Sequence, residues 1–208
     1  MSDLPVLYSF RRCPYAMRAR LALLVAGIVS ELREVKLSDK PEAMLQASAK
    51  GTVPTLVLAG GQVVDESLAI MHHALAQNDP DDWLSGNDAE LIAANDGPFK
   101  HHLDRYKYPN RHDSDPQEHR AEGLSLLKVL EHRLEGQANL HGDAVRMTDV
   151  ALFPFIRQFA HTDRDWFAAQ PIPRVQAWLA RHLASDLFKR AMIKHPQWAP
   201  GDERVIFP

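Results

Sequence analysis

The first third of the chain alternates between short apolar runs and helical patterns. Apolar runs predict strands over residues 4–10, 31–37, 55–58 and 62–64, the last two joined by an Ala-Gly-Gly turn. Helical spacing predicts helices over 14–26, 41–49 and 66–77, and Gly27 marks the first helix end. The order β-α-β-α-β-β-α predicts a small α/β sheet domain over residues 1–77.

Strand signals disappear beyond a segment rich in turn formers and acids, which predicts a linker over residues 78–87. Apolar residues recur at helical spacing over 88–106, 117–134, 148–161, 174–184 and 185–194. Leu124, Leu127 and Leu130 illustrate that spacing. The pattern therefore predicts an all-helical domain over residues 88–208, with a polar loop between its first two helices.

Composition and charge narrow the function. The formal net charge is −3, and positive and negative residues are interspersed along the chain rather than segregated. This distribution gives no indication of binding to nucleic acid or to an anionic membrane. The longest apolar run is too short to span a bilayer. Cys13 is the only cysteine, and the first residues lack a secretory pattern, so we expect a reducing, cytoplasmic location.

Cys13 stands where a strand has ended and Pro14 begins a helix. Unpaired backbone N–H groups and the helix dipole favour a thiolate there, and Arg11 and Arg12 add positive charge. A free cysteine can equally be a small buried apolar residue. Position alone leaves both interpretations open.

Four motifs carry a family resemblance. The segment CPYAMRARLAL resembles the glutaredoxin active-site helix of thioredoxin-fold proteins, and LSDKPEAML, GTVPTLVL and VVDESLAI follow it in order. The helical half contains TDVALFPFIRQF, which resembles a buried hydrophobic helix with Asp149 as its capping aspartate. The whole chain resembles a cytosolic glutathione transferase of the cysteine-using, omega-like type. This family has a thioredoxin-like N-terminal domain and an all-α C-terminal domain.

The resemblance implies a glutathione site in the first domain. Glu66 and Ser67 would hold the ammonium and carboxylate of the γ-glutamyl group, and Lys40 would pair with the glycine carboxylate. A cis Val53-Pro54 peptide would present the Val53 backbone to the ligand. The resemblance thus assigns glutathione contacts to six residues, namely Tyr15, Lys40, Val53, Pro54, Glu66 and Ser67. Each also has a plain structural interpretation, such as a turn for Pro54 or a helix cap for Ser67.

Ala16 bears on the reaction type. A dithiol oxidoreductase carries a second cysteine there, so the resolving thiol would have to come from glutathione. This predicts glutathione-dependent thiol transfer through Cys13, acting on glutathionylated or similar small substrates. Two alternatives stay open: conjugation of glutathione to electrophiles with a hydroxyl from Tyr8 or Ser9, and a non-catalytic binding or regulatory protein of the same fold.

Four further expectations follow from the sequence. A second substrate would lie near aromatic and histidine side chains, for which the candidates are Phe10, Phe99, His102, Tyr106 and Trp166. The neighbouring histidines His72-His73 and His101-His102 point about 100° apart on predicted helices, so no metal is implied. Homodimerisation follows from the resemblance. Finally, Arg146 stands where the family carries a hydroxyl cap, so Thr148 is expected to cap the helix before Asp149.

Overall fold

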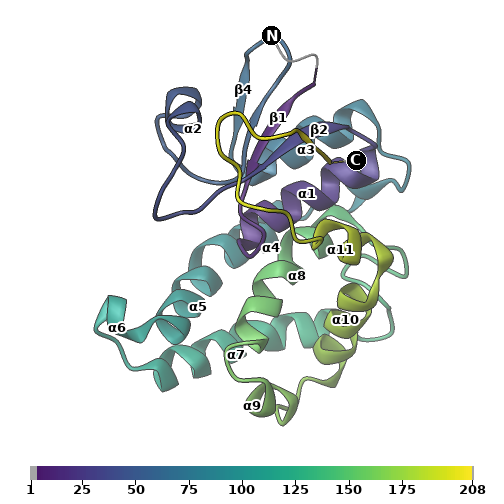
Figure 1. Cartoon of the computed structure of the whole chain (residues 1–208). Coiled ribbons are helices and arrows are strands. Elements are labelled where there is room, and N and C mark those ends of the chain that lie inside the picture. Colours follow the sequence, from purple (N-terminus) through teal and green to yellow (C-terminus); the bar gives the residue numbers. More distant parts are fainter. Residues whose placement is uncertain (1–3, 208) are drawn as a thin grey trace. The chain divides into compact units, whose positions relative to one another are not determined.

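A computed structural model of the chain describes residues 4–207, which form two compact units (Figure 1). The first unit comprises residues up to Asp81 together with Asp186–Pro208, and the second comprises Asp82–Ser185. The sequence had assigned residues 186–208 to the helical domain. The structure instead places them in the first unit, because their last strand pairs with its sheet. Within residues 4–207, no helix is long and apolar enough to cross a membrane.

The first unit is built on a five-stranded mixed sheet with the order β4-β3-β1-β2-β5. Its strands are β1 (Val6–Ser9), β2 (Ser30–Glu34), β3 (Thr55–Val57), β4 (Val63–Asp65) and β5 (Val205–Phe207). Strands β1 and β2 are parallel, whereas the β1–β3, β3–β4 and β2–β5 pairs are antiparallel. Every residue of β1 is buried, as expected for a central strand covered on both faces.

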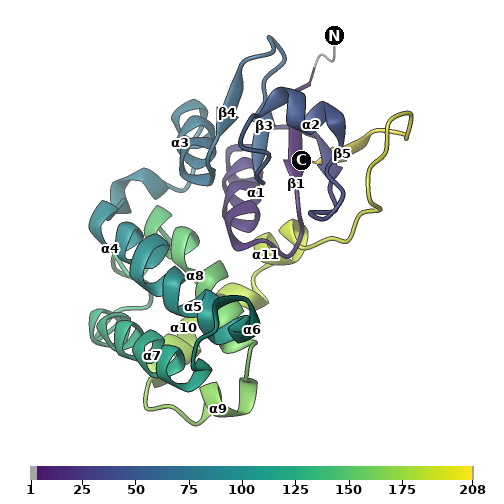
Figure 2. The ribbon, with the colours of Figure 1, turned by 90° about the vertical axis from the view of Figure 1, so that its left-hand side faces the viewer.

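Successive side chains of β1 point to opposite faces of the sheet, and each face is covered by different helices. Val6 and Tyr8 pack in one cluster with Met44 of α2 (Glu42–Ala47). The Ser9 hydroxyl accepts a hydrogen bond from Arg20 of α1 (Pro14–Ala26), on the other face. Helix α1 packs against α3 (Ser67–Gln77) and α11 (Asp186–Ala191). In Figure 2 the yellow C-terminal segment runs from α11 out and back to the sheet, where it forms β5, and this strand pairs with β2.

All the named elements of the second unit within the described residues are helices. Its elements are η1 (Trp83–Gly86), α4 (Ala89–Ala94), a π-helical turn η2 (Asn95–Phe99), α5 (Lys100–Lys107), α6 (Pro109–His112), α7 (Pro116–Arg133), α8 (Met147–Ala160), α9 (Arg164–Ala168) and α10 (Pro173–Ala184). Helix α8 is buried at most positions and forms the centre of this unit. Three predicted features differ from the structure. The helix predicted over 88–106 is interrupted by η2, which contains Pro98. The linker predicted over 78–87 contains η1, and the polar loop predicted between the first two helices of the second unit contains α6.

Candidate active site

Cys13 is the N-cap residue of α1, immediately before Pro14 at the first helical position. Its carbonyl accepts the first helical hydrogen bond from the Met17 N–H at 2.9 Å, and its own N–H donates to the Phe10 carbonyl at 3.0 Å. The side chain is half-buried, with Sγ 3.8 Å from the carbonyl oxygen of Val53. The sulfur therefore lies at the positive end of the α1 dipole and is partly open to solvent.

A buried arginine adds positive charge on the same helix. Arg20 is 2% exposed, and its Nη2 donates to the Arg11 carbonyl at 2.8 Å. Burial lowers the pKa of Arg20 to about 10, while the charges of Glu34 and Cys13 act to raise it. Arg20 thus remains a cation at neutral pH and interacts electrostatically with Cys13. Sequence reasoning had attributed the positive charge to Arg11 and Arg12 and missed Arg20.

The alternative hydroxyl groups, Tyr8 and Ser9, are both buried and hydrogen-bonded. Tyr8 is 3% exposed, and its hydroxyl accepts from Arg33 Nη1 at 2.7 Å. Ser9 is fully buried, and its hydroxyl accepts from Arg20 Nη1 at 2.6 Å. Both hydroxyl groups are therefore occupied as acceptors inside the first unit.

A pocket of about 470 Å³ lies in the first unit. It is lined by Tyr15, Lys50, Thr52, Val53, Pro54, Glu66 and Ser67. The Val53-Pro54 peptide is cis, as the sequence analysis had anticipated. Five of the six residues expected at a glutathione site therefore line one pocket, and its volume is within the range of about 300–1,000 Å³ typical of small-molecule sites.

Lys40 is the sixth expected residue and is absent from the lining residues of this pocket. Its Nζ lies 3.8 Å from where a Cβ on Gly51 would be, so it is close to the loop that carries Lys50 and Thr52. Lys50 lines the pocket itself and forms an exposed ion pair with Glu66, with Nζ 2.6 Å from Oε1. Sequence reasoning missed Lys50, although it stands directly before the GTVPTLVL motif.

The start of α3 brings Glu66 and Ser67 to the pocket. Glu66 has a φ of 73° and is the N-cap residue, and its carbonyl accepts from the Ile70 N–H at 3.0 Å. The buried Ser67 hydroxyl accepts from Arg18 Nε at 2.9 Å. Arg18 is 2% exposed, and its guanidinium lies 5.1 Å from the centre of the Tyr15 ring. A buried cation therefore lies beneath the helix N-terminus that lines the pocket.

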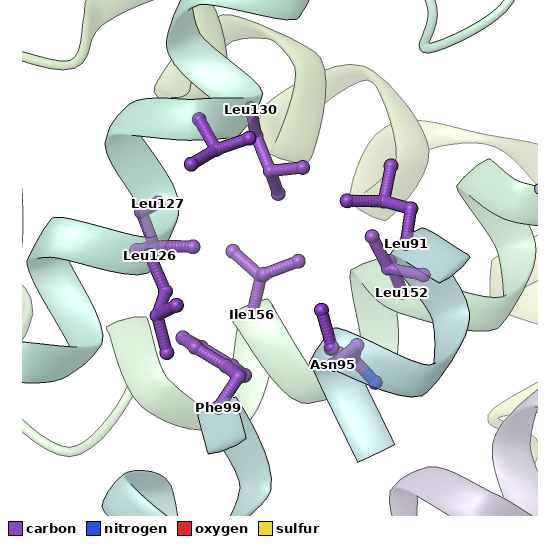
Figure 3. A pocket seen from close by; sticks show the side chains of 10 residues that line it. Leu91, Asn95, Phe99, Leu126, Leu127, Leu130, Leu152 and Ile156 are labelled. Atoms are coloured by element: carbon purple, nitrogen blue, oxygen red, sulfur yellow. The ribbon is translucent and has the colours of Figure 1, made fainter. Parts of the chain in front are cut away.

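The expected second-substrate residues have three different surroundings. Phe10 lies beside Cys13 at the edge of the apolar cluster around Tyr8. Phe99 is buried and lines a small apolar pocket of about 60 Å³ in the second unit, together with leucines of α7 and α8 (Figure 3). Tyr106 and Trp166 pack around the buried ring of Phe159. His102 contacts another histidine on the surface of the unit.

The capping of α8 differs from the expectation for Thr148. The buried Asp149 carboxylate accepts from the Arg146 N–H at 3.0 Å, from the Leu140 N–H at 2.9 Å and from Trp178 Nε1 at 2.8 Å. The Thr148 hydroxyl instead donates to the Gly86 carbonyl at 2.7 Å and accepts from the Asp88 N–H at 2.8 Å. Asp149 therefore holds the loop before α8, and Thr148 binds the segment around η1.

A thioredoxin-like sheet unit with a thiol at the start of its first helix, combined with a helical unit, defines the fold class of this chain. The sequence profile described as "Glutathione S-transferase, N-terminal domain" matches residues 7–83, and that described as "Glutathione S-transferase, C-terminal domain" matches residues 97–181. The chain belongs to the glutathione S-transferase family, a family of enzymes.

Individual relatives agree with this assignment. A probable glutathione transferase of Aplysia californica is 35% identical over 44% of this chain and 97% of its own length. A probable glutathione S-transferase of Nicotiana tabacum is 25% identical over 92% of this chain and 90% of its own. Among solved structures, a glutathione transferase of Burkholderia graminis, with two glutathione molecules bound per subunit, has a TM-score of 0.74 at 23% identity and covers 91% of this chain and 88% of its own.

Proposed function

We propose that this protein is a glutathione-dependent thiol transferase of the cysteine-using, omega-like type, in which Cys13 is the nucleophile. The proposal rests on the difference in exposure between the Cys13 thiol and the hydroxyl groups of Tyr8 and Ser9. The Cys13 thiol is half-exposed at a helix N-terminus, whereas the hydroxyls of Tyr8 and Ser9 are buried and accept hydrogen bonds from arginines. A hydroxyl that activates bound glutathione must reach its sulfur, and the burial of Tyr8 and Ser9 keeps both hydroxyls away from a ligand.

The pocket beside Val53 supplies the features that glutathione requires. The Glu66 carboxylate suits the γ-glutamyl ammonium, while the Ser67 hydroxyl and the backbone N–H groups that begin α3 suit its carboxylate. The buried Arg18 adds favourable charge for that carboxylate. Because Lys50 is paired with Glu66, a bound ammonium would release Lys50 to join Lys40 in pairing with the glycine carboxylate.

The reaction runs in two thiol–disulfide exchanges. The Cys13 thiolate attacks the glutathionyl sulfur of a mixed disulfide, the substrate S–S bond breaks, and the substrate thiolate leaves and takes a proton. The thiolate of a second glutathione then attacks the Cys13 disulfide, which releases oxidised glutathione and regenerates the Cys13 thiolate. Overall, one mixed disulfide and one reduced glutathione give the substrate thiol and one oxidised glutathione, so the substrate sulfur is reduced and the sulfur of the second glutathione is oxidised. With one cysteine in the chain, the resolving thiol comes from glutathione.

The test compares single variants in reduction of a small glutathione mixed disulfide, coupled to glutathione reductase. Cys13→Ala should abolish this activity while the protein remains folded, because the nucleophile is lost. Tyr8→Phe is the matched control: it removes only a buried hydroxyl and should retain the activity. Mass spectrometry after incubation with oxidised glutathione should find one adduct, on Cys13.

The opposite pattern would overturn the proposal. If the parent conjugates glutathione to an aryl halide efficiently, and Tyr8→Phe or Ser9→Ala removes that activity while Cys13→Ala does not, then a hydroxyl activates glutathione. We also propose a cytoplasmic homodimer, on the basis of the family resemblance and the single free thiol. Light scattering of the purified protein tests the dimer directly, and a monomeric mass would contradict it.

A further inference from the structure

Three histidines gather at one place in the helical unit, far along the sequence from Cys13. His101 and His102 belong to the first turn of α5, and His119 belongs to the first turns of α7. Each offers one ring nitrogen, and these three atoms all lie within 4.8 Å of one another. Helices α5 and α7 pack side by side, which brings His119 to the other two (Figure 2).

The sequence analysis had considered His101 and His102 only as an adjacent pair. Their rings nevertheless lie on the same side, with centroids 5.0 Å apart. The ring of His119 lies 5.8 Å from that of His101 and 5.1 Å from that of His102. The third ligand, supplied from another helix, therefore changes the conclusion drawn from the pair alone.

Two ring nitrogens of the cluster share a hydrogen bond, and their separation is close to that of two nitrogens bound to one metal ion. His102 Nδ1 and His119 Nδ1 are 2.8 Å apart, so one ring donates a shared hydrogen to the lone pair of the other. In tetrahedral zinc coordination, Zn–N distances of about 2.0–2.1 Å separate two nitrogens by about 3.3 Å. Replacing the shared proton by a cation therefore requires the two rings to separate by only about half an ångström.

Charged side chains of both signs surround the cluster. The carboxylates of Glu118 and Glu122 favour positive charge at His102, whereas His112 opposes it at His101. A cation bound by the three rings would therefore have two nearby carboxylates to balance part of its charge.

Arg105 is the group most opposed to a cation at this place. Its guanidinium Nη1 lies 3.0 Å from His101 Nδ1 and donates to it. It competes with a metal both as a positive charge and as a partner for the nitrogen lone pair. Its removal is consequently a sensitive test of the cluster.

We propose that His101, His102 and His119 form a binding site for one divalent transition metal of the class that prefers imidazole nitrogen, with zinc as its reference member. Three protein nitrogens leave a fourth coordination position for water. Such a cation would link α5 to α7. All three ligands belong to the helical unit, whereas Cys13 belongs to the first unit.

The test is a zinc titration of the full chain, purified without an affinity tag, in competition with a chromophoric chelator. We expect one tightly bound zinc per chain. His119→Ala and His102→Ala should each weaken binding at least about tenfold, since even loss of an outer-shell partner commonly costs that much. His132→Ala is the matched control, because His132 is an exposed histidine of the same α7 and pairs with Glu135. It should leave zinc affinity unchanged.

Two further measurements keep the proposal falsifiable if a histidine variant fails to fold. Arg105→Gln should bind zinc more tightly than the parent, by roughly tenfold for a nearby unit charge. Cobalt(II) should give visible ligand-field bands without a thiolate charge-transfer band, since Cys13 takes no part. Absence of stoichiometric binding, a thiolate band, or unchanged affinity in a folded His119→Ala variant would each overturn the proposal.

Discussion

Two buried arginines of α1 serve the two sides of the candidate active site. Arg20 lies behind Ser9 and interacts with Cys13, whereas Arg18 supports Ser67 at the start of α3. Each arginine is only 2% exposed, which is uncommon for this residue type. A buried guanidinium requires hydrogen-bond acceptors close by. The same helix therefore carries positive charge to the thiol and to the pocket that we assign to glutathione.

Ser67 is expected to contribute both to ligand binding and to stability. Ser67→Ala should weaken glutathione binding by about 1–3 kcal/mol, because a polar group of the ligand loses its partner in a partly dry pocket. It should also destabilise the fold, since the buried Arg18 Nε loses its acceptor. Calorimetry and thermal unfolding measure the two effects.

Ser48→Ala is the matched control for that experiment. Ser48 is also a buried serine of the first unit, and its hydroxyl donates to Asp65 Oδ2 at 3.0 Å, outside the pocket lining. It should cost stability and leave glutathione affinity unchanged. Equal affinities for Ser67→Ala and the parent would remove Ser67 from the site.

His182 should make stability fall in acid. Burial lowers its pKa in the folded protein to about 4, with Arg181 acting in the same direction and Asp149 opposing it. The unfolded chain titrates near pH 6.5. Between about pH 6.5 and 4 the unfolded chain binds a proton that the folded one does not, so stability falls as pH is lowered, by on the order of 3 kcal/mol at the lower end.

His182→Phe should remove this loss, because it retains the aromatic stack on Phe153 without a titrating nitrogen. Urea unfolding at pH 7.5, 5.5 and 4.5 measures the slope for both proteins. Parallel loss of stability in parent and variant would show that other groups govern the acid transition.

At the scale of elements, Gly123 of α7 lies directly against the ring of Phe159 of α8. A Cβ on this residue would lie 2.5 Å from Cε2 of Phe159, whose ring is fully buried. Gly123→Ala should therefore destabilise the protein by about 1–3 kcal/mol, even though alanine favours a helix by about 1 kcal/mol. Gly97→Ala is the control, since a Cβ there meets nothing within 4 Å. A Gly123→Ala variant as stable as the control would show that Phe159 moves aside freely.

Some elements could be predicted closely because their ends carry local signals. Helix α1 begins at Pro14 and ends at Ala26, directly before Gly27, which has a φ of 68°, so both bounds follow from local residues. Strand β5 has only three residues, and its partner β2 lies far away in the sequence. Its pairing is a tertiary effect that no local pattern contains, which is why residues 205–207 were assigned to the helical domain.

Some residues of the candidate site could likewise be predicted from local sequence motifs, whereas others could not. Motif resemblance singled out Tyr15, Pro54 and Ser67, and the structure places all three in the lining of one pocket. It could not identify Arg18 or Arg20, because arginine on a helix is ordinarily a surface residue. Nor could it identify the histidine cluster, whose third member, His119, comes from a different helix.

For the whole molecule, the C-terminal segment completes the first unit. The Trp198 N–H donates to the Glu34 carbonyl at 2.8 Å, and its ring lies 4.2 Å from the Arg33 guanidinium and edge-on to Tyr8. Further on, Arg204 pairs with Glu31 at 3.3 Å, and β5 covers the outer edge of β2. The segment thus protects a sheet edge and an aromatic cluster together.

A chain that stops after residue 194 should lose at least about 2 kcal/mol of stability, from exposure of Tyr8, loss of Trp198 and loss of β5. It should also aggregate, because the β2 edge becomes free to pair. A chain that stops after residue 203 retains Trp198 and should lose less. Denaturant unfolding and light scattering measure both effects, and two truncated chains as stable and soluble as the parent would refute this role of the segment.

The interrupted order of the first unit has a consequence for synthesis on the ribosome. Asp82–Ser185 is continuous and can fold as soon as it has emerged, whereas the sheet must wait for β5, which is made last. At about 5–20 residues per second, the 173 residues between the ends of β2 and β5 leave the β2 edge bare for roughly 9–35 seconds. During that interval we expect a holdase chaperone to bind the N-terminal third of the chain, and to be released when β5 docks.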